Sequence, residues 1–379
     1  MKKILSLVMI LCLIFCASAM AEDTIKIGLV TAVTGSNSLV GEESTEGAML
    51  AINEINAAGG LLGKQLELVI TDEVDNLEAS VLATMELLAN DEIVGIIGSM
   101  YSQYCIAAMP TVAEIGVPYI SLGSSSGVSK ENNPYTWQDR PLDTAQGQVL
   151  ANFVKDELGA KNPAIMHSTQ STFQSLADQT IAALKAAGIE ITEKNVFGFP
   201  EDESNYAPYI SQVMAGDFDA LICMGNQAPA AVICQQVEAA GLTSEMMPLV
   251  GSTSWCSAVC ITNAGSAADG WYSVSDWVPG GANEVSAAFE ANYTAAYPHR
   301  AISDLAAVAP YDAVYILAKA IEIAGTTDHE AVNAAMEQVE FQGCISYFKY
   351  DADHSFASAL SVTQNIDGKP VCIKAIQYR

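Results

Sequence analysis

Residues 24–31 read TIKIGLVT, a run rich in apolar and β-branched side chains, and they open the pattern that decides the fold. Residues 43–56 follow with apolar side chains at helical spacing, and Gly59-Gly60 ends that segment. The alternation continues with strands expected at 66–71, 93–97 and 117–120, and helices expected at 77–89 and 103–114. Apolar strands that alternate with helices are typical of a parallel sheet covered on both faces.

The same rhythm begins again after a turn-rich break from Gly123 to Asp143. Further helices are expected at 145–158, 176–187, 206–214 and 229–240, with strands at 163–167, 189–197, 220–224 and 247–250. After Trp277 come two or three helices, including 310–324, and then strands near 345–350, 359–363 and 371–377. The pattern predicts an α/β protein with two doubly wound lobes and a ligand site at the carboxyl ends of their strands.

The N-terminal segment has the features of an export signal. Lys2 and Lys3 precede an apolar run over residues 4–15, and Ala19-Met20-Ala21 supplies a small-x-small cleavage site. We therefore expect a signal peptide over residues 1–21 and a periplasmic or extracellular protein that begins near Glu22. The alternative is a lipoprotein anchored through Cys16, although Phe15 is bulky where such motifs carry a small residue.

Charge and length narrow the class of protein. Once Lys2 and Lys3 are removed, 14 basic residues stand against 44 acidic ones, a formal charge of −30. This charge argues against nucleic acid or an anionic membrane as a partner. No later stretch is long and apolar enough to span a bilayer, and the mature chain is too long for one ordinary core.

Seven cysteines follow the signal segment, so they cannot all pair within one chain. Cys223 and Cys234 lie in apolar runs and are expected to be small core residues. Cys256 and Cys260 form the best candidate for a local disulfide. They make a poor zinc motif, because no other His or Cys pair stands nearby to complete four ligands.

Several motifs together resemble the branched-chain amino-acid periplasmic binding proteins. In chain order they are Val33-Thr34-Gly35, Gly47-Ala48, Glu54-Ile55-Asn56, Gly59-Gly60, Ile96-Ile97-Gly98-Ser99, Val117-Pro118-Tyr119-Ile120-Ser121, Gln236, Ala240-Gly241-Leu242 and Tyr311-Asp312-Ala313-Val314-Tyr315. Each motif is weak alone, but their order and spacing are fairly specific and cover nearly the whole mature chain.

The resemblance implies a type I periplasmic-binding fold with a three-crossover hinge between the lobes. Mapped onto this sequence, lobe one is 22–143 plus 277–355, and lobe two is 144–276 plus 356–379. It implies the solute-binding component of an ABC importer, with permease subunits as partners and an amino acid, amide or aromatic acid as ligand. A ligand-sensing module for a membrane receptor is the alternative.

The resemblance also implies the ligand-contacting positions. Ser102 and Ser125 match the hydroxyl residues that hold the ligand carboxylate, although Ser102 suits a helix cap equally well. The loops around them add Tyr101, Gly123 and Ser124, while Tyr104 either lines the cleft or only packs. From lobe two we expect contacts from Thr172, Phe173, Asn226, Thr253 and Trp255.

Thr253 is the main departure from the family pattern, because it stands where the family has the acid that pairs with the ligand ammonium. A buried ammonium without a carboxylate partner is costly. Either another acid serves, or the ligand lacks an ammonium, and we expect a ligand other than leucine, isoleucine or valine. Asp143 matches a hinge position and is a poor substitute. Arg140 is expected to be a solvated surface residue, with an anion contact as the alternative.

One motif points to an enzyme instead. Residues 123–127 read GSSSG, which matches the G-x-S-x-G elbow of serine hydrolases and would make Ser125 a nucleophile. An elbow runs directly into a helix, whereas residues 128–134 have loop composition. His299, His329 and His354 follow, the first two in polar surface contexts. The sequence therefore predicts a binding protein with no catalytic residues, metal or cofactor.

Overall fold

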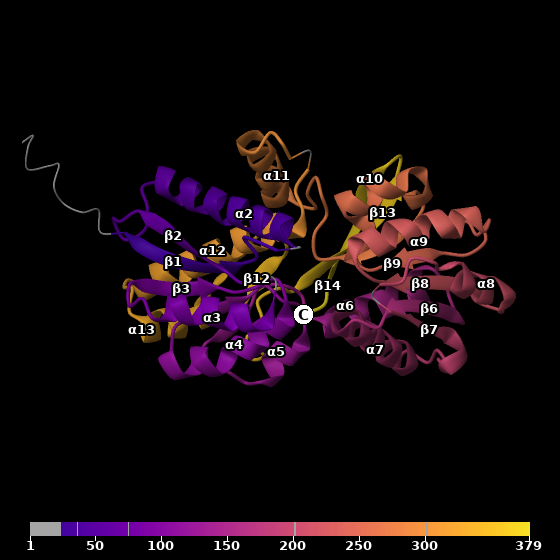
Figure 1. The fold of residues 1–379 in the computed structure, drawn as a ribbon, viewed down its shortest axis with the longest axis horizontal. Helices are drawn as coiled ribbons and strands as arrows, with labels where there is room; N and C mark the ends of the chain where they lie inside the picture. The colour runs from indigo at the N-terminus through magenta and orange to yellow at the C-terminus, as the bar shows by residue number, and fades with distance from the viewer. Residues whose placement is uncertain (1–23, 36, 75, 201, 301) are drawn as a thin grey trace, which may run out of the picture.

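The computed structural model describes residues 24–35, 37–74, 76–200, 202–300 and 302–379. Two lobes lie side by side, with β1–β5 in one and β6–β10 in the other (Figure 1). The predicted signal peptide and the Cys16 lipoprotein motif lie outside the described residues. None of the described helices is long and apolar enough to cross a membrane.

Lobe one contains a five-stranded parallel sheet in the order β2-β1-β3-β4-β5. Every residue of β3 is buried, which explains why its sequence is apolar throughout. The strands are β1 (Ile25–Thr31), β2 (Leu66–Asp72), β3 (Ile93–Ile97), β4 (Tyr119–Ser121) and β5 (Thr136–Gln138). Helices α2 (Ser38–Ala57), α3 (Leu77–Leu88), α4 (Ser102–Ile115) and the short α5 (Ser126–Lys130) connect them.

Lobe two contains a seven-stranded sheet in the order β14-β13-β10-β9-β8-β6-β7. The parallel strands are β6 (Pro163–Ser168), β7 (Val196–Phe199), β8 (Ala220–Met224), β9 (Leu249–Gly251) and β10 (Tyr272–Ser275). The hairpin β13 (Ala359–Ile366) and β14 (Lys369–Gln377) adds two antiparallel strands. The helices are α6 (Asp143–Asn152), which continues as a π-helical turn over Phe153–Glu157, α7 (Ser171–Ala186), α8 (Ala207–Ala215), α9 (Gln227–Ala239) and α10 (Ala258–Ala264).

The chain crosses between the lobes three times, after β5, after β10 and before β13. Between the last two crossings it returns to lobe one as α11 (Glu284–Ala296), α12 (Leu305–Ala324), α13 (His329–Ala335) and the hairpin of β11 (Glu340–Gln342) and β12 (Tyr347–Lys349). Helix α12 packs against α2, where Gly47 allows close approach: a Cβ there would lie 1.8 Å from the Ala307 carbonyl oxygen. The predicted fold class is confirmed, whereas the residue boundaries of the lobes stay a prediction.

Several elements differ from the sequence prediction, among them β7 and β5. The strand expected at 189–197 begins only at Val196, because Ile189 and Ile191 pack into the lobe-two core from a loop and a 3-10 turn covers Glu193–Asn195. Strand β5 lies inside the break that we assigned to turns. A strand of three residues is too short to show a periodicity, so only its pairing with β4 reveals it.

Candidate functional site

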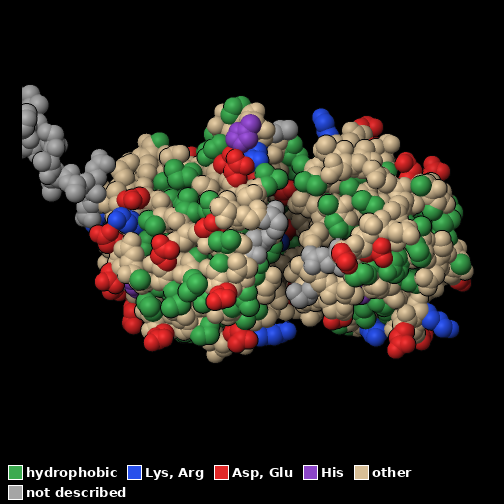
Figure 2. All heavy atoms as spheres, viewed as in Figure 1, with side chains coloured by type: hydrophobic (Ala, Val, Ile, Leu, Met, Phe, Trp, Pro, Cys, Tyr) green, Lys and Arg blue, Asp and Glu red, His purple; other side chains and the backbone are tan. Residues whose placement is uncertain are grey.

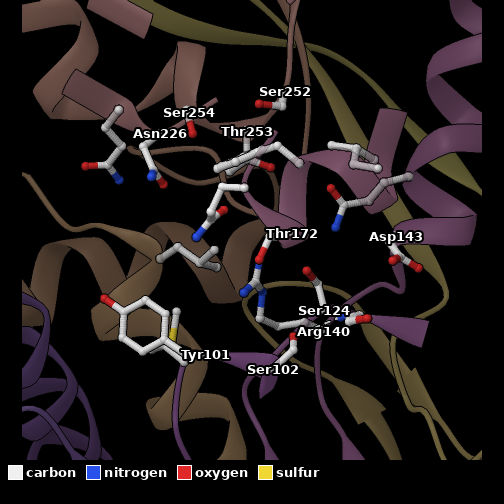
Figure 3. Close-up of a pocket in the computed structure, with 18 of the residues that line it drawn as sticks. Tyr101, Ser102, Ser124, Arg140, Asp143, Thr172, Asn226, Ser252, Thr253 and Ser254 are labelled. Atoms are coloured by element: carbon white, nitrogen blue, oxygen red, sulfur yellow. Dashed lines mark hydrogen bonds between the residues drawn. The ribbon is translucent and has the colours of Figure 1, made fainter. Parts of the chain in front are cut away.

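A cavity of about 180 Å³ lies between the lobes, where the carboxyl ends of the strands of both sheets meet (Figure 3). This volume suits a ligand smaller than a typical drug molecule. Of the residues predicted for the site, those that line the cavity are Tyr101, Ser102, Ser124, Ser125, Thr172, Phe173, Asn226 and Thr253. Tyr104 packs against the Tyr101 ring, with the ring centroids 5.3 Å apart.

The lobe-one wall is built around Ser102 and Ser125. Ser102 is the first residue of α4, and its Oγ accepts the backbone N–H of Ser125 at 3.2 Å. The Oγ of Ser125 caps α5 by accepting the N–H of Gly127 at 3.1 Å. Both oxygens already accept a bond, so their hydroxyl hydrogens are the groups that can donate to a ligand anion.

Gly123 does not line the cavity, which corrects its assignment as a ligand contact. A Cβ at this position would lie 2.4 Å from Ser102 Oγ and 2.8 Å from Ser102 Cα. The glycine is therefore needed for the close approach of the loop after β4 to the start of α4. Its carbonyl oxygen accepts the Gln138 side-chain amide at 2.8 Å, which ties this loop to β5.

The lobe-two wall consists of polar residues that follow β6, β8 and β9. Gln170, Asn226 and Ser252 each stand just after one of these strands. The Ser252 hydroxyl and the side-chain amide oxygen of Gln170 are buried without a hydrogen-bond partner. These two groups therefore have unused hydrogen-bonding capacity at the cavity.

Trp255 is fully buried in the lobe-two core and does not line the cavity. The structure therefore places this residue away from the ligand site for which we predicted it. The 3-10 turn Thr253–Cys256 points the indole back over Gly251, where a Cβ would lie 2.2 Å from Trp255 Cγ. The ring packs against Trp271 at a centroid distance of 5.7 Å.

Arg140 lines the cavity and is only 9% exposed, so the expectation of a solvated surface arginine is wrong. Its Nε lies 2.8 Å from Oδ2 of Asp276, and its NH1 donates to the Leu122 carbonyl oxygen at 3.1 Å. The Thr253 hydroxyl donates to the other oxygen of Asp276 at 3.1 Å. The first two crossovers and the cavity wall are thus joined by one buried ion pair.

Asp304 is a cavity residue that the sequence analysis missed. It caps α12, with Oδ1 accepting the N–H of Leu305 at 2.6 Å and Oδ2 accepting the Gln227 side-chain amide of lobe two at 3.2 Å. Burial raises the pKa of this carboxyl above its usual value, and the bonds from Leu305 and Gln227 oppose that shift. An Asp directly before an apolar helix was the available signal, but it indicates a cap and not a cavity.

The Asp304 carboxylate in the cavity bears on the ligand that Thr253 had suggested. The sequence left two alternatives, another acid or a ligand without an ammonium. With Asp304 on the wall, the premise that the cavity lacks an acid fails. Thr253 therefore gives no reason to exclude leucine, isoleucine or valine as the ligand.

The predicted disulfide between Cys256 and Cys260 is wrong, because all seven cysteines of the described chain are free thiols. The Cys256 Sγ bonds to the Thr253 carbonyl oxygen at 3.2 Å, within its own 3-10 turn. The Cys260 thiol instead meets the Cys234 thiol between α10 and α9.

The hydrolase alternative depends on a base near Ser125. Our expectation of a loop after the GSSSG motif is wrong, since α5 begins at Ser126. However, none of the described residues that line the cavity is a histidine. His299 pairs with Glu46, and the rings of His329 and His354 bond to backbone oxygens of Ile93 and Thr136. The site therefore offers binding groups without a histidine base.

Comparisons with known proteins agree with this geometry. A family model described as periplasmic binding protein matches residues 24–369. A leucine-, isoleucine-, valine-, threonine- and alanine-binding protein of Pseudomonas aeruginosa is 27% identical over 337 residues, 86% of each chain. An amino acid binding protein of the same organism is 27% identical over 231 residues, and that match spans 61% of each chain.

A solved structure is similar over nearly the whole chain. It is the branched-chain amino acid transporter substrate binding protein LivJ of Streptococcus pneumoniae, in complex with isoleucine. The sequences are 24% identical, the TM-score is 0.80, and the match covers 93% of this chain and 99% of that one. At this identity the likeness shows a shared fold.

Proposed function

Because the chain belongs to the periplasmic binding protein family, we propose that it is the extracytoplasmic solute-binding component of an ABC importer. In this role it captures a small carboxylate-bearing ligand by closing its two lobes and delivers it to permease subunits in the membrane. It binds the ligand without converting it. The names of the amino-acid-binding relatives support an amino acid as the ligand class.

The observation that carries this proposal is the lobe-one wall of the cavity. Ser102 and Ser125 both line the cavity and are joined by the bond from the Ser125 N–H to Ser102 Oγ at the start of α4. This helix has 14 residues, and its first backbone N–H groups have no side-chain cap. Hydroxyls and free N–H groups at a helix N-terminus bind a carboxylate without a lysine or arginine partner. The anchoring roles of Tyr101, Ser124, Thr172, Phe173, Asn226 and Thr253 are part of the same proposal, since each lines the cavity.

Calorimetry tests the proposal with leucine, isoleucine, valine, threonine and alanine as ligands. We expect at least one of them to bind, and Ser102→Ala to lose about 1.5–3 kcal/mol of binding free energy, or roughly ten- to a hundredfold in affinity. Ser211→Ala is the matched control, because Ser211 is exposed on α8 and bonds only to the Ala207 carbonyl oxygen.

Solution scattering on the same samples tests lobe closure. A saturating amino acid should reduce the radius of gyration, because closure brings the lobes together. Full affinity in Ser102→Ala, or hydrolysis of an ester that Ser125→Ala abolishes, would contradict the proposal.

A further inference from the structure

Three charged side chains line the cavity, and two of them are already engaged within the protein. Arg140 is paired with Asp276. The carboxylate of Asp143 accepts the N–H of Ser126 at 3.1 Å through Oδ1 and the hydroxyl of Ser175 at 2.5 Å through Oδ2. These bonds connect α5 to α7, so Asp143 serves the connection between the lobes.

Asp304 is engaged differently. No lysine or arginine of the described chain forms a salt bridge with it, and across the cavity its Oδ2 accepts only the neutral amide of Gln227. A carboxylate forms stronger hydrogen bonds with a cation than with a neutral donor. A ligand ammonium can therefore replace the Gln227 amide on Oδ2 while the Leu305 N–H keeps Oδ1 in place.

The charges around Asp304 favour a cation. Burial raises the pKa of Glu43 on α2, and the nearby Asp304 adds to that rise. Burial likewise raises the pKa of Asp304, and Asp276 at the second crossover adds to it. The nearby arginines pair with acids other than Asp304: Arg140 with Asp276, and Arg300 with Glu42 and Glu46 and, at 3.7 Å, with Glu43. A bound cation would relieve this concentration of negative charge.

The opposite ends of the cavity have complementary chemistry. Figure 3 shows Ser102 on one side of the cavity and Ser252 on the other. The Ser102 side offers hydroxyl and helix N–H donors. On the other side, the Ser252 hydroxyl, which can donate or accept, and the side-chain amide oxygen of Gln170, which accepts, are buried without a partner. An unpartnered acceptor at a cavity is satisfied by a ligand that carries N–H groups.

We propose that Asp304 binds the ammonium group of the ligand, and that the ligand is a zwitterionic α-amino acid whose carboxylate lies at Ser102 and Ser125. This inference rests on the proposed function and adds a specificity-determining residue to it. The Asp304 carboxylate then pairs with the ligand ammonium, the role that the family resemblance assigns to position 253, where this sequence has the neutral Thr253.

The test compares each amino acid with the same carboxylic acid lacking its amine, for example leucine with 4-methylpentanoate. The probes are leucine, isoleucine, valine, threonine and alanine and their five deaminated acids, measured by calorimetry. Asp304→Asn removes the charge but keeps a good helix cap. Asp328→Asn is the matched control, because Asp328 is the N-cap of α13, where its Oδ1 accepts the Ala331 N–H, and it does not line the cavity.

We expect the wild-type protein to bind an amino acid at least tenfold more tightly than its deaminated acid. Asp304→Asn should weaken that amino acid at least tenfold and leave the deaminated acid unchanged or tighter, while Asp328→Asn changes neither. Equal wild-type affinity for both members of a pair, or full amino-acid affinity in Asp304→Asn, overturns the inference but leaves carboxylate capture intact. Binding of none of the ten probes overturns the proposed function and this inference together.

Discussion

The two walls of the cavity are rich in the same kinds of polar side chain, but those side chains are bonded differently. On the lobe-one wall, Ser102 and Ser125 accept backbone N–H groups, and the Gln138 amide fixes the carbonyl oxygens of Gly123 and Ser125. On the lobe-two wall, the Ser252 hydroxyl and the side-chain amide oxygen of Gln170 are buried without partners.

This difference assigns different tasks to the walls. The lobe-one wall is held in place by its own hydrogen bonds before a ligand arrives, so it is preorganised. A buried unsatisfied polar group costs about 1–3 kcal/mol, so a ligand that bonds to Ser252 and Gln170 removes a cost of the ligand-free protein. Binding should therefore begin on lobe one, and contacts to lobe two should favour closure.

The largest effect should come from the ion pair that joins the two walls. Arg140→Ala leaves Asp276 buried and unpaired, and we expect the free energy of unfolding to fall by about 3–5 kcal/mol in urea titrations. Lys319→Ala removes an exposed ion pair with Glu322 and should change nothing measurable. Equal stability of the two variants would show that the walls do not depend on this pair.

A second prediction concerns pH and lobe one. Burial raises the pKa of Glu43 on α2 and of Asp312 on α12 to about 7 each. The folded state then keeps protons that the unfolded state releases. Their contribution to the free energy of unfolding is fully present below about pH 4, the usual carboxyl range, and is lost as the pH rises through 7. Each proton contributes a slope of at most about 1.4 kcal/mol per pH unit.

Urea unfolding between pH 4.5 and pH 8 measures this slope. Glu43→Gln should flatten it, whereas Glu330→Gln, on the exposed face of α13, should not. A wild-type free energy of unfolding that rises with pH throughout this window, together with the same slope in Glu43→Gln, would show that lobe one does not hold these protons.

The third prediction tests the contrast between the walls directly, without ligand. Ser102→Ala removes the acceptor of the Ser125 N–H and should lower the free energy of unfolding by about 1 kcal/mol. Ser252→Ala removes a hydroxyl that has no partner and should leave the stability unchanged or slightly higher. Thermal unfolding of both variants checks this order, and the reverse order would refute a preorganised lobe-one wall.

The smallest effect concerns the thiols. Cys372 on β14 is half-buried, whereas the other six described cysteines are buried, and burial raises the pKa of Cys105 to about 11 and of Cys256 to about 12. A protein of residues 24–379 should react quickly with one equivalent of maleimide and with seven after unfolding. Cys372→Ser should abolish the fast reaction, and a second fast thiol would show an opening of one lobe.

The part of the site that the sequence could predict lies at strand ends. Ser102, Ser125 and Asn226 each follow an apolar strand, and the carboxyl ends of parallel strands point to one edge of a sheet. That rule needs only the order of strands and helices. It fails for Trp255, because the direction of its side chain depends on a 3-10 turn and on the space above Gly251.

The sequence by itself determined the two α/β lobes, the position of the cleft and an acidic chain; the face shown in Figure 2 carries many more acidic than basic side chains. Only the tertiary structure brought Asp304 to Gln227 and Arg140 to Asp276, across 77 and 136 positions of the chain. The reason is physical. Periodicity records which face of an element is buried, whereas a contact between distant residues depends on how the packed lobes and crossovers place their side chains.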